Sequence, residues 1–289
     1  MSSTGAAAVA LLGDGAAGAA AAPFFLIAGP CVLEDDALNL AVGQVLARLA
    51  DELALPIVYK ASFDKANRSR AGAARGPGLA RGLEQLARVR RETGLPVLTD
   101  VHEPGQCARA AEVVDVLQIP AFLSRQTDLV EAAAATGRPL NLKKGQWMAP
   151  EDMAGAVRKA RGAGAPAVVV TERGTFLGYG DLVVDMRSFL RMREATGARV
   201  VFDGTHSVQR PGRAEGASGG DPRFTPPLVR AAVAAGADAL FLEVHPHPET
   251  APSDGSNMLR LDRLRPLLEE VLAIRAALKP DAALEVAGA

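Results

Sequence analysis

A cluster of basic and small polar residues follows a short apolar stretch near residue 60. The segment YKASFDKANRSR, residues 59–70, holds four cations and one acid: Lys60, Lys65, Arg68, Arg70 and Asp64. The whole chain has a formal net charge of −1, so this excess of positive charge is local. Arginine offers a planar fork of donors and lysine a point charge, and both suit phosphate oxygens. Taken alone, the segment fits either a site for a multiply charged anion or a solvated basic loop.

A second set of residues has the types that bind metals. It contains one thiol, one imidazole and two carboxylates: Cys31, His206, Glu243 and Asp254. Singly, each is weak evidence, because a lone cysteine in a strand is most often a small buried hydrophobe. Together they could hold a divalent transition metal, but such mixed ligands do not choose between zinc, iron, manganese and cobalt.

One pattern, an apolar run followed by a helical segment, repeats from residue 24 onward. The eight runs span residues 24–32, 56–63, 95–103, 113–122, 139–145, 167–174, 199–206 and 239–246. Their bodies are apolar or β-branched, as expected of strands buried on both faces. Eight alternations in about 250 residues predict an α/β fold, a single-domain (β/α)8 TIM barrel. A doubly wound open sheet is the alternative, but it usually has fewer strands and a glycine fingerprint after the first.

The barrel prediction brings the unusual residues together, because the chemistry of such barrels lies at the C-terminal ends of their strands. Alternation along the fifth strand turns Asn141 and Lys143 toward the lumen. The same parity turns four further residues inward: Lys60, Gln118, Arg173 and Glu243. The cations that converge on this mouth are Lys60, Lys65, Arg68, Lys143 and Arg173. Since charged residues inside a barrel are rarely structural, they predict a site for more than one phosphate or carboxylate.

The metal-binding types also converge in a closed barrel, where the eighth strand neighbours the seventh and the first. Cys31 ends the first strand, His206 ends the seventh, Glu243 lies in the eighth, and Asp254 follows in the next loop. This joint placement predicts a metal site beside the anion site. His102 ends the third strand beside Asp100, inside the same mouth.

Composition sets further limits. Of 289 residues, 48% are hydrophobic and 22% are charged, which is typical of a soluble globular protein. The near-zero net charge gives no reason to expect nucleic acid as a partner, and no long apolar run away from the N-terminus indicates a membrane span. Two cysteines are too few for a disulfide framework, which favours a reducing cytoplasm. We expect residues 1–22 to form a disordered or loosely attached Ala/Gly-rich tail, residues 23–280 the barrel, and residues 281–289 a C-terminal tail.

Eight motifs resemble the 3-deoxy-D-manno-octulosonate 8-phosphate synthase family. They are AGPC (28–31), KASFDKANRS (60–69), TDVHE (99–103), LQIPAFLSRQTDL (117–129), NLKKGQ (141–146), ERGTFLGYGDLVVDM (172–186), FDGTHSVQ (202–209) and EVHPHPETAPSDGS (243–256). They run in order through all eight predicted strands. KANRS is the most specific, since the sister heptulosonate 7-phosphate synthases share the barrel but carry a KPRTS-like segment there.

The resemblance implies an enzyme that condenses phosphoenolpyruvate with arabinose 5-phosphate and releases phosphate, a step toward lipopolysaccharide. Lys60, Lys65, Gln118, Lys143 and Arg173 would hold phosphoenolpyruvate. Asn67, Arg68 and Ser69 would hold the sugar phosphate, helped by a neighbouring subunit of a homotetramer. Asp100 is expected to bind substrate as well. Cys31 and Asp254 are similar to the metal-dependent branch of the family; its metal-independent branch has Asn in place of the cysteine. His206 is then expected as a ligand, and His102 or a metal-bound water as the proton carrier.

Two positions depart from the family pattern. Arg70 stands where a second serine is common, and Gly204 where a side chain is usual. We expect the Gly- and Arg-rich loop 210–224 to close over the site, as such loops often do. The nearest rival function is the heptulosonate 7-phosphate synthase, with erythrose 4-phosphate as the aldehyde. A metal-dependent barrel hydrolase would show a His-x-His pair at the first strand, and a non-catalytic sugar-phosphate-binding barrel would not need the metal set.

Overall fold

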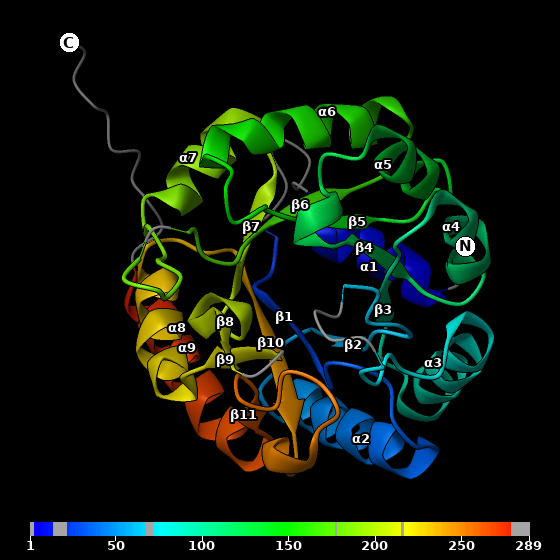
Figure 1. The fold of residues 1–289 in the computed structure, drawn as a ribbon, viewed down its shortest axis with the longest axis horizontal. Helices are drawn as coiled ribbons and strands as arrows, with labels where there is room; N and C mark the ends of the chain where they lie inside the picture. The colour runs from blue at the N-terminus through cyan, green and yellow to red at the C-terminus, as the bar shows by residue number, and fades with distance from the viewer. Residues whose placement is uncertain (1–2, 14–21, 68–71, 177, 215–216, 279–289) are drawn as a thin grey trace.

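The computed structural model describes residues 3–13, 22–67, 72–176, 178–214 and 217–278. Eight parallel strands form a closed barrel: β1 (Phe25–Gly29), β2 (Ile57–Lys60), β3 (Val97–Asp100), β4 (Val116–Ile119), β5 (Leu140–Lys143), β6 (Val168–Glu172), β7 (Arg199–Asp203) and β10 (Ala239–His245). Each strand pairs with the next, and β10 pairs with β1 in register from Phe25 opposite Ala239 to Gly29 opposite Glu243. The predicted (β/α)8 barrel is confirmed (Figure 1).

Eight helices surround the strands: α2 (Asp36–Glu52), α3 (Leu79–Thr93), α4 (Pro104–Ala111), α5 (Thr127–Ala134), α6 (Met153–Gly162), α7 (Ser188–Thr196), α8 (Thr225–Ala234) and α9 (Leu264–Ala277). Short 3-10 turns are η1 (Ala121–Leu123), η2 (Pro150–Asp152), η3 (His206–Val208), η4 (Pro222–Phe224), η5 (Pro248–Thr250) and η6 (Leu261–Arg263). Apolar residues on α2 and α3, including Val42 and Leu86, are fully buried against the barrel. No helix in the described ranges is both long and apolar enough to cross a membrane.

The strands alternate between two apolar layers, as their parity predicts. Leu26, Leu117 and Leu142 belong to the outer layer between strands and helices. Val58, Val169 and other residues of opposite parity fill the inside of the barrel. Two residues further along the inward-facing side of the strands, polar residues follow, as Lys60 follows Val58. The lumen is therefore apolar toward the N-terminal ends of the strands and charged toward their C-terminal ends.

The N-terminal segment departs from our prediction of a disordered or loosely attached tail. Residues 3–12 form helix α1 (Ser3–Leu12), and the buried side chains of Ala8 and Leu12 join the apolar cluster inside the barrel. Arg199 donates a hydrogen bond to the carbonyl oxygen of Leu11, which satisfies one group at the C-terminal end of α1. It also donates to the carbonyl oxygen of Pro23 at 2.7 Å. This segment therefore forms a plug under the barrel, at the end opposite the predicted site.

The loop expected to cover the mouth contains a hairpin. Strands β8 (Gln209–Ala214) and β9 (Ala217–Gly220) pair antiparallel, with Gln209 opposite Gly220. A further short strand, β11 (Leu259–Arg260), extends the sheet beside the end of β10. In Figure 1 this hairpin lies among the loops that follow β7 and β10.

Replacing Leu12 with alanine tests the plug. Because the Leu12 side chain is fully buried, the Leu12→Ala variant should lower the free energy of unfolding by about 2–5 kcal/mol, measured by urea denaturation. Ala7→Ser on the exposed face of the same helix is the matched control and should change it by about 0.5 kcal/mol or less. Equal stability of the Leu12→Ala variant and the wild type would show that α1 is not docked.

Candidate active site and metal centre

A buried ion pair at the C-terminal end of the barrel joins β2 and β10, which lie on either side of β1. Lys60 Nζ lies 2.8 Å from Glu243 Oε1, and neither side chain is more than 2% exposed. Lys60 also donates to the carbonyl oxygen of Cys31 at 3.0 Å, and Lys65 Nζ lies 4.0 Å from Glu243 Oε1. Burial alone would raise the pKa of Glu243, but the positive charge of Lys60 lowers it overall. The carboxylate is therefore ionised, and both predicted lysines reach it.

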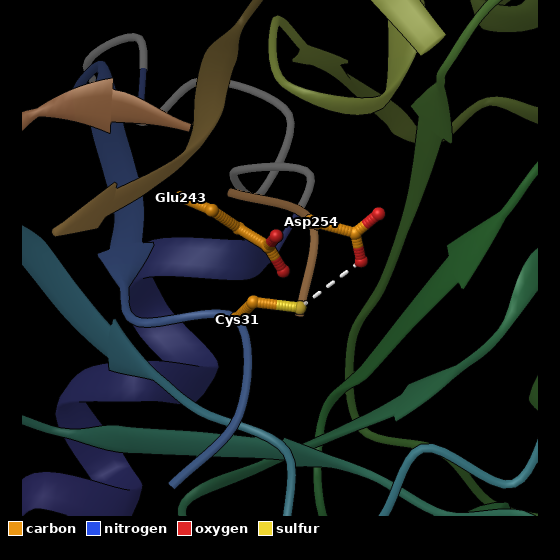
Figure 2. Close-up of side chains that lie close together, drawn as sticks. All are labelled: Cys31, Glu243 and Asp254. Carbon is orange, nitrogen blue, oxygen red and sulfur yellow. Dashed lines mark hydrogen bonds between the residues drawn. The ribbon is translucent and has the colours of Figure 1, made fainter. Parts of the chain in front are cut away.

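Three of the four predicted metal ligands come together beside this pair. The ligand atoms of Cys31, Glu243 and Asp254 all lie within 4.8 Å of one another. Figure 2 shows the sulfur and the two carboxylates pointing toward one another. Cys31 Sγ lies 3.2 Å from Asp254 Oδ2 and 3.1 Å from the hydroxyl oxygen of Ser253. Adjacent strands explain this convergence, because Cys31 follows β1, Glu243 lies in β10, and these strands are paired.

One feature of this cluster suits a cation, and one opposes it. Glu243 Oε2 is buried and has no hydrogen-bond partner among the described residues, although such atoms are normally satisfied. Burial, and then the negative charge of Glu243, raise the pKa of the Cys31 thiol well above its ordinary value. A metal bound here would therefore have to displace the thiol proton.

His206, the fourth predicted ligand, borders this cluster but is outside it. Its Nε2 atom lies 3.7 Å from Glu243 Oε2, while its Nδ1 atom lies 2.7 Å from Asp203 Oδ2. Donation from Nδ1 to the carboxylate leaves the lone pair on Nε2, the nitrogen that faces Glu243. Asp203 thereby sets the orientation of the ring.

Asp203 is a site residue that sequence reasoning missed. It also pairs with Lys143 of β5, a strand separated from β7 by β6 alone. Burial alone would raise the pKa of Asp203, but its contacts with His206 and the charge of Lys143 hold it far below the ordinary value. Burial lowers the pKa of Lys143 to about 8, partly offset by Asp203; the Lys143 ammonium lies 3.3 Å from the centroid of the Phe241 ring. The available signal was parity, because Asp203 follows the inward-facing Val201 by two residues.

Arg173 reaches the same mouth from the end of β6. It is 5% exposed, and one terminal nitrogen donates to Gln209 Oε1 at 2.6 Å. The other terminal nitrogen is buried without a hydrogen-bond partner in the described part of the chain, so it has donors to offer an anion. Gln209, which sequence reasoning did not single out, also donates to Asp254 Oδ1 at 3.0 Å.

The remaining predicted residues that are described lie on neighbouring strands. Gln118 accepts a hydrogen bond from Asn141 at 2.9 Å, inside the barrel. Asp100 lies 2.9 Å from His102 Nε2 and accepts from the Ser62 hydroxyl. The His102 Nδ1 atom is buried with no hydrogen-bond partner among the described residues.

The sugar-phosphate segment is only partly described. Asn67 is exposed at the mouth end of the segment after β2. Arg68 and Ser69, predicted to hold the sugar phosphate, and the unusual Arg70 lie outside the described residues. The four basic residues that are described nevertheless all face one buried, charged mouth: Lys60, Lys65, Lys143 and Arg173.

Comparisons with known proteins agree with this geometry. A model of the DAHP synthetase I family matches residues 10–279. A 2-dehydro-3-deoxyphosphooctonate aldolase of Magnetococcus marinus is 52% identical over 263 residues, 91% of this chain and 91% of the relative. Proteins of the same name from Rhodopseudomonas palustris and Nitratidesulfovibrio vulgaris are each 55% identical, over 90% and 88% of this chain and 90% and 93% of their own lengths. The chain therefore belongs to the DAHP synthetase I family, and its relatives at this identity are 2-dehydro-3-deoxyphosphooctonate aldolases.

Proposed function

We propose that this chain condenses phosphoenolpyruvate with D-arabinose 5-phosphate and water, giving 3-deoxy-D-manno-octulosonate 8-phosphate and phosphate. The observation that carries the proposal is the set of buried cations, Lys60, Lys143 and Arg173, which three strands bring to one mouth. Two phosphorylated substrates need such a set. The shared name of the relatives and the KANRS segment select arabinose 5-phosphate over erythrose 4-phosphate.

The two substrates would occupy different parts of the mouth. Phosphoenolpyruvate would lie against five residues, with its phosphate and carboxylate on the cations: Lys60, Lys65, Gln118, Lys143 and Arg173. The second terminal nitrogen of Arg173, unpartnered among the described residues, supports this placement. The sugar phosphate would lie nearer the segment after β2, held by Asn67, Arg68 and Ser69, with Asp100 close by.

The reaction requires a new C–C bond and the loss of phosphate by C–O cleavage. C3 of the enol attacks the aldehyde carbon of the sugar while water adds at C2, and the resulting hemiketal phosphate then expels phosphate. The fixed cations stabilise the charge on both phosphoenolpyruvate anions without reorganising, because their partners already orient them. One proton leaves the water and one reaches the former aldehyde oxygen. His102 can carry a proton on Nδ1 while Asp100 holds its Nε2 atom.

A divalent transition metal fits beside this mouth. Cys31, Glu243 and Asp254 would hold it, with His206 completing the set, and the unpartnered Glu243 Oε2 atom supports the assignment. These ligands leave zinc, iron, manganese and cobalt as candidates. When bound, such an ion supplies a Lewis acid for the aldehyde oxygen or for the water.

We also propose a homotetramer in the cytoplasm. Phe122 and Trp147, half exposed, stack with their ring centroids 5.6 Å apart on the outside of the barrel mouth, a type of surface that subunits commonly cover. The two cysteines are both free thiols, which suits a reducing compartment.

Phosphate release distinguishes the two possible aldehydes. With phosphoenolpyruvate present, we expect turnover with arabinose 5-phosphate and at least tenfold less with erythrose 4-phosphate, measured as kcat/KM. A discrimination of this size corresponds to about 1.4 kcal/mol of transition-state binding. Preference for erythrose 4-phosphate would replace the substrate assignment with the heptulosonate activity.

Cobalt binding tests the metal ligands without using activity. Chelator-treated protein titrated with Co²⁺ should develop a thiolate-to-cobalt charge-transfer absorption, because the Cys31 sulfur lies in the cluster. Cys31→Ala should abolish this band. Cys107→Ala, which alters the other buried cysteine, should leave it unchanged. Loss of the band in the Cys107 variant alone would place the metal elsewhere.

The lowered pKa of Lys143 predicts a pH dependence of binding. Asp203, Lys60 and Glu243 surround its ammonium, and burial brings its pKa to about 8. As pH rises through this value, Lys143 loses its charge, so phosphoenolpyruvate affinity should fall by up to about tenfold per pH unit. Calorimetry from pH 7 to 9.5 measures this decline.

The matched variant for this measurement is Lys143→Arg. Its guanidinium stays protonated throughout the range, so the affinity of this variant, whatever its value at pH 7, should stay level up to pH 9.5. A wild-type affinity that does not change between pH 7.5 and 9.5 would contradict the role of Lys143.

A further inference from the structure

The Gln209 side chain connects the anion site to the metal cluster. Its Oε1 atom accepts from Arg173 at 2.6 Å, and its Nε2 atom donates to Asp254 Oδ1 at 3.0 Å. Chemistry fixes the direction of this amide, because a guanidinium only donates and a carboxylate only accepts. Gln209 is 8% exposed, so both hydrogen bonds are made largely away from solvent.

Asp254 combines an unusual backbone conformation with contacts from three side chains. Its φ angle of 53° lies in the left-handed region, which residues with a Cβ atom seldom adopt. Cys31 and Ser253 contact its Oδ2 atom at 3.2 and 3.0 Å. Gln209 holds the other oxygen, Oδ1. Without Gln209, the carboxylate would be restrained through one oxygen alone among these contacts and would be freer to rotate.

The backbone of Gln209 is fixed where the hairpin meets the turn that carries Asp254. Gln209 opens β8 opposite Gly220. A Cβ atom on Gly220 would lie 1.4 Å from Asn257 Oδ1, so the hairpin base packs directly on this turn. Within the turn, the backbone N–H of Asn257 donates to the Asp254 carbonyl oxygen at 2.8 Å. Because the backbone is held in this way, the side-chain amide of Gln209 can move only if its hydrogen bond to Arg173 or to Asp254 changes.

We propose that Gln209 is a positioning residue that couples phosphoenolpyruvate binding at Arg173 to divalent metal binding at Asp254. An anion that engages the second terminal nitrogen of Arg173 fixes the guanidinium, and Gln209 passes this restraint to the Asp254 carboxylate. Each ligand then tightens the binding of the other by the same factor. The inference rests on the proposed function, since it takes phosphoenolpyruvate as the anion.

The test measures this factor directly. Chelator-treated protein is titrated with Co²⁺, followed by its absorbance, with and without saturating phosphoenolpyruvate. In the wild type we expect phosphoenolpyruvate to lower the Kd for Co²⁺ by about fivefold or more. Gln209→Met keeps the length of the side chain but removes both hydrogen bonds, and Gln209→Asn keeps the amide but is too short to span both partners. Both variants should bring the factor close to one.

Gln85→Met provides the matched control. Gln85 is a buried glutamine on α3 that donates to the carbonyl oxygen of Glu34, outside the mouth, and its variant should keep the wild-type factor. An unchanged factor in both Gln209 variants overturns the inference and leaves the proposed function intact. A fall in the Gln85 variant as large as in the others also overturns it, because the effect would then be one of packing. A wild type that binds no phosphoenolpyruvate overturns the proposed function and the inference with it.

Discussion

Burying ammonium groups inside the barrel is the constraint on which the mouth depends. An unpaired buried charge is too costly to keep, so each lysine needs an acid supplied by another strand. Lys60 from β2 is paired with Glu243 from β10, and Lys143 from β5 with Asp203 from β7. Each pair joins two strands that are separated by one intervening strand, which requires the strands to hold a fixed register. The pairs therefore orient the cations before any substrate arrives, and this orientation is what an anion site needs.

The opposite end of the barrel makes this charge distribution possible. Leu12 of α1, with Phe241 and other apolar residues, fills the lumen below the charged layer. Lys143 lies directly on the Phe241 ring, and this apolar floor explains why burial lowers its pKa even though Asp203 stands beside it. The plug and the charged mouth are thus linked through packing, although they lie at opposite ends of the strands.

The inward-facing residues of the mouth were predictable from the sequence because backbone geometry alone determines their direction. Parity along eight strands correctly placed Lys60, Lys143 and Glu243 in the lumen, since alternation does not depend on neighbouring side chains. It did not reveal partners that lie far apart in the chain, such as Asp203 for Lys143.

Helix α1 was missed for a related reason. Its Ala-rich sequence gives little amphipathic signal, and its burial depends on a barrel floor that only the folded chain provides. Residues 68–71, which include two predicted sugar-phosphate ligands, lie outside the described structure.

Two side chains, Asp203 and Gln209, connect the anion-binding cations to the metal cluster, and they do so through different interactions. Asp203 places one carboxylate between Lys143 and His206, so its negative charge acts on both side chains. Gln209 is neutral and passes on orientation rather than charge between Arg173 and Asp254. If position 209 held a carboxylate, it would repel Asp254, and if it held a cation, it would repel Arg173. A neutral amide, which donates and accepts at one end, satisfies both partners without changing the charge balance that the buried lysines require.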